Sequence, residues 1–387
     1  SMEYGQIAQL SRPVSRFVFG TAHPVFFSAT RSLHGEEAGF EQALDTAFRL
    51  LDAVYAMGVN TLDCSNHYGE EPVGEWLTAR GLHEEVLILT KGAHHNSWRK
   101  RVTPYDILTD AHDSLAKLGK QSLDIYLLHR DDPKEPVGPV MEALSTLYQQ
   151  GKVRLIGVSN WSLERIQEAN AYAGQHGLAP FSVNSPHYGL AHQLTDVWGG
   201  GCQTLTGPEN QAAREWFIQQ KMPIFAYSSL ARGLFSGRFQ SSQREKMAET
   251  LDEYAKKGYV DEDNLRRLER AEMIAREKGV SVYELMNRDA AASVPGSHGI
   301  VYLPYLSGER CPYPDPDCRS VFYGMNLKTT EMVVGSAPEQ SAIKLATQTT
   351  QNESSLSMRD SSCPKGPTRK RQRRPTCYRS AARDCMS

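Results

Sequence analysis

Short apolar segments alternate with longer segments of helical period from about residue 16 to residue 285. Most of these apolar segments contain β-branched or aromatic residues, which is typical of a buried strand. The segments with this character are 16–20, 61–65, 86–91, 125–130, 155–160, 181–184 and 223–229. The alternation predicts a parallel sheet whose strands are connected by crossover helices.

Three of the connecting segments carry apolar residues at intervals of three and four positions and then end in glycine, as many helices do. These segments are 41–58, 103–119 and 136–151. Thr103 followed by Pro104 predicts a helix start, because the hydroxyl can cap free backbone amides and proline fits the first turn.

Two kinds of parallel sheet fit these strands. Segments such as LILT and IYLL are apolar on both faces, as expected for strands covered by helices outside and by a packed barrel interior inside. A doubly wound sheet would give a similar pattern, but no GxGxxG follows the first predicted strand, where a Rossmann domain holds its pyrophosphate. We therefore expect a (β/α)8 TIM barrel.

Reactive side chains fall at the ends of three successive predicted strands, where barrel enzymes place their chemistry. Lys91 would be costly to bury without a carboxylate partner, and Asp63 is placed to supply one. Tyr68 follows Asp63 by five residues, and a neighbouring cation lowers the pKa of a phenol and makes it a better proton donor. His129 is placed to orient a carbonyl oxygen beside that phenol. Each residue alone is more often structural, so the hypothesis depends on their joint placement.

The ordered motifs D-x-x-x-x-Y-G, TK, LLH, GVSN and AYSSLARGLFSG resemble those of the aldo-keto reductases over about residues 15–285. This resemblance implies that Asp63, Tyr68, Lys91 and His129 form the active site of a barrel that uses NADPH, with NAD as the alternative cofactor. The implied reaction is hydride transfer to a carbonyl carbon while Tyr68 protonates the oxygen.

The same resemblance implies cofactor contacts on the later strands. Ser159 and Asn160 would hold the nicotinamide carboxamide. Ser185 would contact the same group, at the position where many members of the family have a glutamine. Tyr227 would stack on the nicotinamide ring, and Ser228 and Leu230 would contact the pyrophosphate.

The segment 187–207 is long for a plain connection, which favours a functional loop. We expect it to form a wall of the substrate site, with Tyr188 and Trp198 as apolar or sugar-stacking surfaces, although packing for stability is an equal alternative for Trp198. His67, His94 and His95 also lie near the predicted strand ends. We interpret them as loop residues, with substrate contact as the less favoured alternative. No spacing of histidine, cysteine and acidic residues predicts a metal site.

The reductase resemblance ends near residue 286. Residues 287–327, which include GSHGIVYLPYLSGER and PDPDCRSVFYG, resemble a fragment of the xylulokinase-type sugar kinases. The eighth βα unit is therefore predicted to be missing or substituted. Within 328–350, either a helix continues the kinase-like segment or EMVVGSAPEQ restores an eighth strand. We divide the chain into a barrel at 1–286, an atypical segment at 287–350 and a basic, disordered tail at 351–387.

Composition narrows the classes of function further. The net charge of −2 is the sum of two unlike parts. The terminal segment 363–387 has eight basic residues and one acidic residue, and the remainder of the chain has 35 basic and 44 acidic residues. An acidic body argues against a nucleic-acid role for the barrel. No long apolar run or secretory signal is present, and the seven cysteines form no CxxC pair, so we expect a cytoplasmic protein with reduced thiols and no membrane contact.

Two functions fit the sequence. The first is NADPH-dependent reduction of a small-molecule carbonyl substrate, with a sugar-like preference suggested by the kinase-like fragment and the aromatic loop. The alternative is a cofactor-binding but catalytically impaired barrel with a regulatory or vestigial role, which a missing eighth unit would favour. A kinase activity is excluded unless a separate chain supplies the remainder of both kinase domains. No feature of the sequence specifies an oligomeric state.

Overall fold

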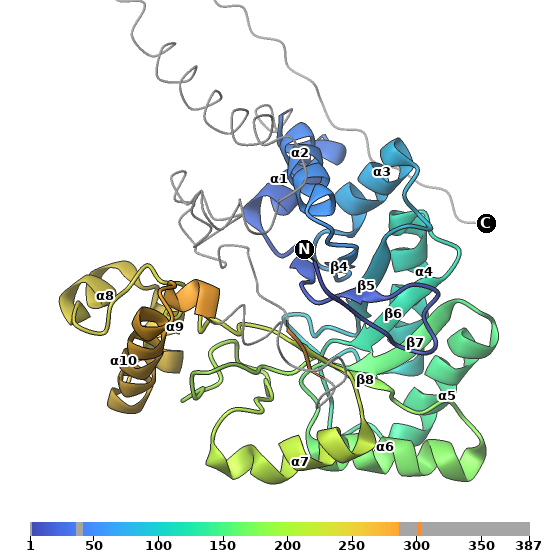
Figure 1. Ribbon diagram of the computed structural model, residues 1–387. Helices are drawn as coiled ribbons and strands as arrows, with labels where there is room; N and C mark the ends of the chain where they lie inside the picture. The colour runs from blue at the N-terminus through green and yellow to red at the C-terminus, as the bar shows by residue number, and fades with distance from the viewer. Residues whose placement is uncertain (1, 36–41, 286–299, 303–387) are drawn as a thin grey trace, which may run out of the picture. The chain divides into compact units, whose positions relative to one another are not determined.

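The computed structural model describes residues 2–35, 42–285 and 300–302. Eight strands of this part form one parallel sheet, in which each strand pairs with its neighbours in chain order (Figure 1). They are β3 (Phe19–Gly20), β4 (Thr61–Asp63), β5 (Leu87–Gly92), β6 (Leu123–Leu128), β7 (Val153–Val158), β8 (Val183–Asn184), β9 (Ile224–Ala226) and β10 (Ile300–Tyr302). The seven strands predicted from the apolar segments are confirmed as β3 to β9.

The eighth strand comes from an unexpected part of the chain. Ile300 pairs with Ile224 and Tyr302 with Ala226, so β10 lies parallel to β9 in the position of an eighth barrel strand. This strand belongs to the segment 287–327, whose expected resemblance to a sugar kinase has no support from the structure, and the eighth strand is not missing. The rest of that segment, the alternative strand EMVVGSAPEQ and the basic tail lie outside the described residues.

Helices connect successive strands along the sheet, as the alternating pattern predicted. They are α1 (Pro24–Leu33), α2 (Ala43–Ala56), α3 (Glu70–Arg80), α4 (Pro104–Leu118), α5 (Val137–Gln149), α6 (Leu163–His176), η1 (Pro208–Asn210), α7 (Gln211–Gln220), α8 (Arg244–Thr250), α9 (Glu253–Tyr259) and α10 (Glu262–Glu277). The predicted helices are confirmed as α2, α4 and α5. Thr103 caps α4 as expected, since its side chain accepts a hydrogen bond from the Asp106 amide.

Successive residues of the strands belong to two different apolar cores, because side chains alternate between the faces of a sheet. Ile88 and Tyr126 belong to the outer core beneath the helices, whereas Leu89 and Leu127 belong to the inner core of the barrel. Both faces are therefore buried, as the apolar segments predicted.

An N-terminal hairpin closes the inner core at the amino ends of the strands. It consists of β1 (Tyr4–Gly5) paired antiparallel with β2 (Val14–Ser15). Ile7, Leu10 and Val14 pack against the inward side chains of the barrel. The Ser15 amide donates to Asn60 Oδ1 at 2.9 Å, directly before β4, which fixes the hairpin to this end of the sheet. The hairpin leaves the carboxyl ends of the strands for the site.

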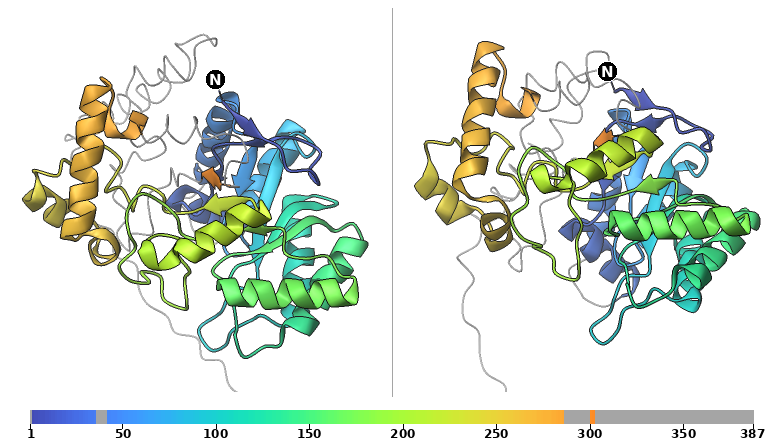
Figure 2. Two further views of the ribbon diagram at one scale, coloured as in Figure 1. Left: turned by 60° about the horizontal axis from the view of Figure 1, so that its bottom comes forward. Right: turned by 90° about the horizontal axis from the view of Figure 1, so that it is seen from below.

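A third apolar core lies beyond β9. It is formed by the segment that follows β9 together with α8, α9 and α10, which form a group of their own in both views of Figure 2. Leu268 and Tyr259 are fully buried in this part of the chain. In the part of the chain that the structure describes, no helix has the length and apolar character needed to cross a membrane.

The packing of the inner core can be tested by truncating one of its side chains. Leu127 is fully buried there, so Leu127→Ala removes apolar contacts and leaves a cavity. We expect the free energy of unfolding, measured by urea denaturation, to fall by about 2–5 kcal/mol. Leu33 is 37% exposed, and Leu33→Ala is the matched control, with an expected change within about 0.5 kcal/mol. Equal effects of the two substitutions would contradict a packed barrel interior.

Candidate active site

Lys91 is a buried cation at the carboxyl end of β5, with only 2% of its surface exposed. Its ammonium forms an ion pair with Asp63, which ends the neighbouring strand β4. The same Nζ donates hydrogen bonds to the Cys64 carbonyl oxygen at 3.1 Å and to the Tyr68 hydroxyl at 2.9 Å. The carboxylate compensates the buried charge, and the hydroxyl is the third group that the ammonium contacts.

The loop between β4 and α3 fixes the backbone of Tyr68. The amides of Ser65 and Tyr68 each donate to the carbonyl of the other, at 3.0 and 2.9 Å. Gly69 follows with a φ of +80°, and a Cβ at this position would collide with the Thr21 hydroxyl. Because glycine is required there, the chain can turn sharply into α3 and leave the phenol beside Lys91.

His129 follows β6, and its imidazole faces the phenol. The ring centroids of Tyr68 and His129 are 6.1 Å apart and nearly perpendicular. Burial, reinforced by the positive charge of Lys91, holds the pKa of His129 well below its usual value of 6.5. Its buried Nδ1 has no hydrogen-bond partner within the described part of the chain. His129 is therefore a neutral imidazole beside the Tyr68 ring.

A second polar group spans the ends of β7, β8 and β9. The Ser159 hydroxyl donates to the Ser185 carbonyl at 2.7 Å, and Tyr227 Oη donates to Asn160 Oδ1 at 2.6 Å. Asn160 Nδ2 donates to the His129 carbonyl at 3.1 Å, which connects this group to the catalytic candidates. The structure therefore brings together Ser159, Asn160, Ser185 and Tyr227.

Two buried oxygens in this group are unsatisfied within the described residues. They are Ser185 Oγ and Asn184 Oδ1, at the carboxyl end of β8. A buried polar atom without a partner costs free energy, and a bound ligand with amide groups would satisfy it. Ser185 Oγ fits the nicotinamide carboxamide that the sequence resemblance implied. Asn184 follows the inward-facing Val183, so its side chain lies on the outer face of β8.

Ser228 and Leu230 lie in the tight turn directly after Tyr227. Ser228, Ala231 and Arg232 all have a positive φ, between 50° and 52°. The Ala231 amide donates to the Ser228 carbonyl at 2.9 Å, whereas the Leu230 side chain packs against the third core. Three residues of the turn therefore have a left-handed backbone conformation, which is uncommon for residues other than glycine. Backbone strain of this kind is often found at ligand-binding sites.

Tyr188 and Trp198, the two aromatic residues expected to face a substrate, pack against helices. Tyr188 lines a cavity of about 350 Å³ together with Phe217 of α7. Trp198 stacks on Tyr254 of α9, with ring centroids 5.7 Å apart, and the Arg232 guanidinium lies 4.5 Å from its ring centroid. These contacts give both rings a packing role, and substrate contact by either stays a prediction.

Other residues connect the segment 187–207 to the strand ends. The Gln203 amide donates to Asn160 Oδ1 at 3.3 Å. Arg130, directly after His129, donates to the Gly199 carbonyl at 3.2 Å and to Cys202 Sγ at 2.7 Å. The loop 187–207 therefore contacts the site through backbone groups and the Cys202 side chain. From the sequence, only the aromatic residues of this loop were candidates, and these contacts were not predicted.

His94 lies in a loop, as expected, and its ring also contacts the candidate site. The His94 and His129 ring centroids are 4.7 Å apart, and those of His94 and His67 are 4.4 Å apart. The position of His94 three residues after Lys91 was the available signal. Across residues 2–35, 42–285 and 300–302, no group of three or more histidine, cysteine and acidic residues is arranged to hold a metal ion.

The fold and the site define a (β/α)8 barrel with a buried lysine, a tyrosine, an aspartate and a histidine at the carboxyl ends of its strands. The chain belongs to the aldo/keto reductase family, which matches residues 32–303. This match extends through β10 and so includes the eighth strand.

Two relatives and one solved structure illustrate the similarity. The chain is 33% identical over 193 residues to AAD14, a putative aryl-alcohol dehydrogenase of Saccharomyces cerevisiae, covering 41% of this chain and 50% of the relative. It is 26% identical over 244 residues to the aldo-keto reductase YhdN of Bacillus subtilis, covering 61% of this chain and 65% of the relative. The chain thus spans about half to two thirds of the length of these relatives.

A glycerol dehydrogenase from Gluconobacter oxydans, AKR11B4, is similar in structure. The TM-score is 0.53 at 20% sequence identity, and the match covers 86% of this chain and 94% of the dehydrogenase. At this level of identity the likeness establishes the fold alone, and it agrees with the barrel predicted from the sequence.

A buried histidine beside Tyr227 makes the stability of the site dependent on pH. His187 is 1% exposed, its Nδ1 lies 2.8 Å from Thr204 Oγ1, and burial lowers its pKa from 6.5 to about 3. Between these two values the unfolded chain binds a proton that the folded chain does not. The free energy of unfolding therefore falls as the pH falls below about 6.5, by at most about 1.4 kcal/mol per pH unit for this group.

We expect His187→Gln to reduce the slope of this pH dependence between pH 6.5 and pH 5, measured by urea denaturation. The matched control is His176→Gln, which replaces an exposed histidine at the end of α6. Identical slopes for the wild type and His187→Gln would contradict the burial of a neutral imidazole at this position.

Proposed function

We propose that this protein is an NADPH-dependent oxidoreductase that reduces the carbonyl group of an aldehyde or ketone to an alcohol. The observation that carries the proposal is the hydrogen bond of 2.9 Å from the buried Lys91 ammonium to the Tyr68 hydroxyl, beside the neutral His129. Membership of the aldo/keto reductase family supports the same reaction class.

Each catalytic residue has a distinct task in this reaction. A reduced nicotinamide, when bound, supplies the hydride. Tyr68 donates its hydroxyl proton to the carbonyl oxygen as negative charge develops there. Lys91 stabilises the phenolate that remains, because its ammonium donates a hydrogen bond to the same oxygen.

Asp63 and His129 prepare the site for this proton transfer. The Asp63 carboxylate forms an ion pair with the buried Lys91 ammonium and directs it toward Tyr68. Because His129 is a neutral imidazole, it donates at most one N–H, which we assign to the carbonyl oxygen of the substrate. The carbonyl is then held between His129 and Tyr68.

The cofactor is assigned to the polar group at the ends of β7, β8 and β9 and to the turn that follows. Ser159, Asn160 and Ser185 hold the carboxamide, which supplies partners for the unsatisfied Ser185 Oγ. Tyr227 stacks on the nicotinamide ring, and Ser228 and Leu230 contact the pyrophosphate. The choice of NADPH over NAD follows from the family resemblance of the sequence.

The names of the relatives are compatible with this reaction. An aryl-alcohol dehydrogenase removes from an alcohol the hydride and proton that carbonyl reduction adds, so the same residues act in reverse. The proposed substrate is therefore a small-molecule carbonyl compound or the corresponding alcohol.

The role of Tyr68 is tested by Tyr68→Phe, which removes the transferable proton and keeps the ring. We expect kcat/KM for aldehyde reduction to fall by about 10²–10⁴-fold, while the Kd for NADPH from fluorescence titration stays unchanged. Tyr105 is 74% exposed on α4, and Tyr105→Phe is the matched control with full activity. Undiminished turnover by Tyr68→Phe would refute the assignment. A wild-type protein that binds NADPH but reduces no carbonyl would instead be the catalytically impaired barrel.

The cofactor site is tested by Ser185→Ala, which deletes the hydroxyl assigned to the carboxamide. Loss of one neutral hydrogen bond should raise the Kd for NADPH by roughly 2–10-fold. The exposed Ser242 provides the control, Ser242→Ala, with an unchanged Kd. Titration of the wild type with NADPH and NADH tests the cofactor preference, and tighter binding of NADH would overturn it.

A further inference from the structure

His94 is a polar residue at the site that the proposed reaction does not use. It lies in the connection between β5 and α4, three residues after Lys91. Its half-buried ring is in edge contact with the rings of His129 and His67, at centroid distances of 4.7 and 4.4 Å, and lies 4.3 Å from that of His95. His94 is therefore adjacent to the residue assigned to hold the carbonyl oxygen.

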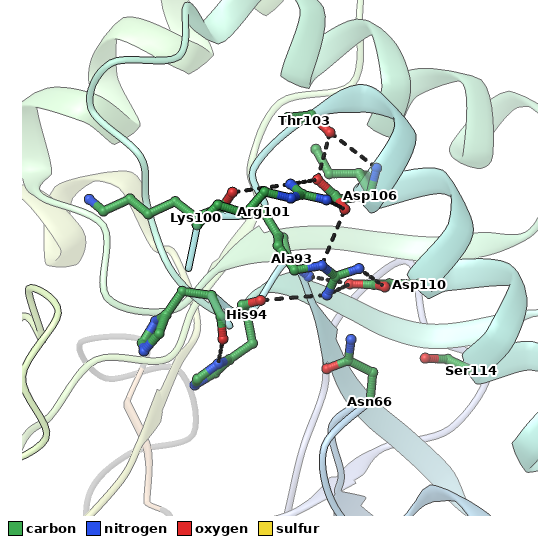
Figure 3. A network of polar contacts seen from close by, with 12 residues as sticks. Asn66, Ala93, His94, Lys100, Arg101, Thr103, Asp106, Asp110 and Ser114 are labelled. Atoms are coloured by element: carbon green, nitrogen blue, oxygen red, sulfur yellow. Dashed lines mark hydrogen bonds and ion pairs between the residues drawn. The ribbon is translucent and has the colours of Figure 1, made fainter. Parts of the chain in front are cut away.

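The backbone that carries His94 is fixed to α4 by the polar network in Figure 3. Ala93 has a φ of 59°, and its amide donates to Asp110 Oδ2 at 2.8 Å. Arg101 donates to Asp110 Oδ1 at 2.6 Å and to the His94 carbonyl at 3.5 Å. Because Asp110 is 4% exposed, these contacts form within the protein and hold the loop in one position.

A hydrogen bond inside the loop determines which nitrogen of His94 carries the proton. Nδ1 lies 2.7 Å from the carbonyl oxygen of His95 (Figure 3). A carbonyl oxygen only accepts, so Nδ1 is the donor. Burial also lowers the pKa of His94 from 6.5 to about 3, so the ring is neutral and has a single N–H. Nε2 is consequently a hydrogen-bond acceptor, and among the residues that the structure describes its lone pair has no partner.

We propose that His94 Nε2 accepts a hydrogen bond from a hydroxyl group of the substrate, so that the enzyme selects carbonyl compounds with a hydroxyl on the carbon next to the carbonyl. The proposal rests on the proposed function, because the position of the carbonyl between Tyr68 and His129 defines the neighbouring carbon. A hydroxyl group supplies the proton that this acceptor needs. A carboxylate has no proton to donate, and the lone pair of Nε2 would repel its negative charge.

The experiment compares two aldehydes that differ by one hydroxyl, lactaldehyde and propionaldehyde, with the full chain and NADPH. We expect the wild type to have the higher kcat/KM for lactaldehyde. His94→Phe keeps a ring in the cluster and removes the acceptor. It should lower kcat/KM for lactaldehyde about tenfold and change that for propionaldehyde by less than about twofold.

Two further variants separate hydrogen bonding from packing. His94→Asn has an acceptor oxygen and should recover part of the lactaldehyde preference. His95→Phe keeps the backbone carbonyl that orients His94, so it should retain the wild-type ratio of the two kcat/KM values. Equal losses for both aldehydes in His94→Phe, or no wild-type preference, would overturn the inference while leaving the proposed function intact. No reduction of either aldehyde by the wild type would overturn both.

The tautomer provides a test that is independent of catalysis. Long-range ¹H–¹⁵N NMR spectra of the full chain at pH 7, assigned by comparison with His94→Phe, should show a neutral His94 protonated at Nδ1. A charged ring, or a ring protonated at Nε2, would overturn the inference whatever the kinetics.

Discussion

The candidate site depends on one buried cation. The Lys91 ammonium lies inside the barrel mouth, where an isolated charge would be very costly, and Asp63 on the neighbouring strand makes its burial tolerable. The pair then provides a fixed positive charge against the Tyr68 hydroxyl and helps to keep His129 neutral. The ion pair thus acts on both residues that are assigned to the carbonyl oxygen, on Tyr68 through a hydrogen bond and on His129 as an addition to the effect of burial.

The barrel makes this arrangement rigid. Strands β4, β5 and β6 are adjacent and parallel, so residues at their carboxyl ends share one mouth. Inward side chains such as Leu89 and Leu127 fill the space below the site, and the N-terminal hairpin closes the opposite end. Water is thereby excluded from beneath the ion pair. The network from Asp110 to Ala93 adds the same rigidity to the loop above it.

The sequence predicted much of this organisation and missed the parts that depend on distant packing. The seven strand segments and the set of Asp63, Tyr68, Lys91 and His129 were readable because period and position at strand ends are local properties. The contact between His94 and His129 could not be predicted, because it depends on how two loops from different strands meet. Tyr188 and Trp198 have aromatic side chains suited to a substrate wall, but their contacts with α7 and α9 depend on the folded chain.

The sequence by itself determined the alternation of strands and helices, the resemblance to a reductase family and the identity of the candidate catalytic residues. Only the tertiary structure decided that Ile300–Tyr302 is the eighth strand, because a three-residue strand is specified by pairing with β9 rather than by its own composition. It also decided the protonated nitrogen of His94, since a tautomer follows from the partner that a ring meets. The local sequence pattern therefore determined which reactive side chains the site can contain, and contacts between distant parts of the chain determined how those side chains are arranged.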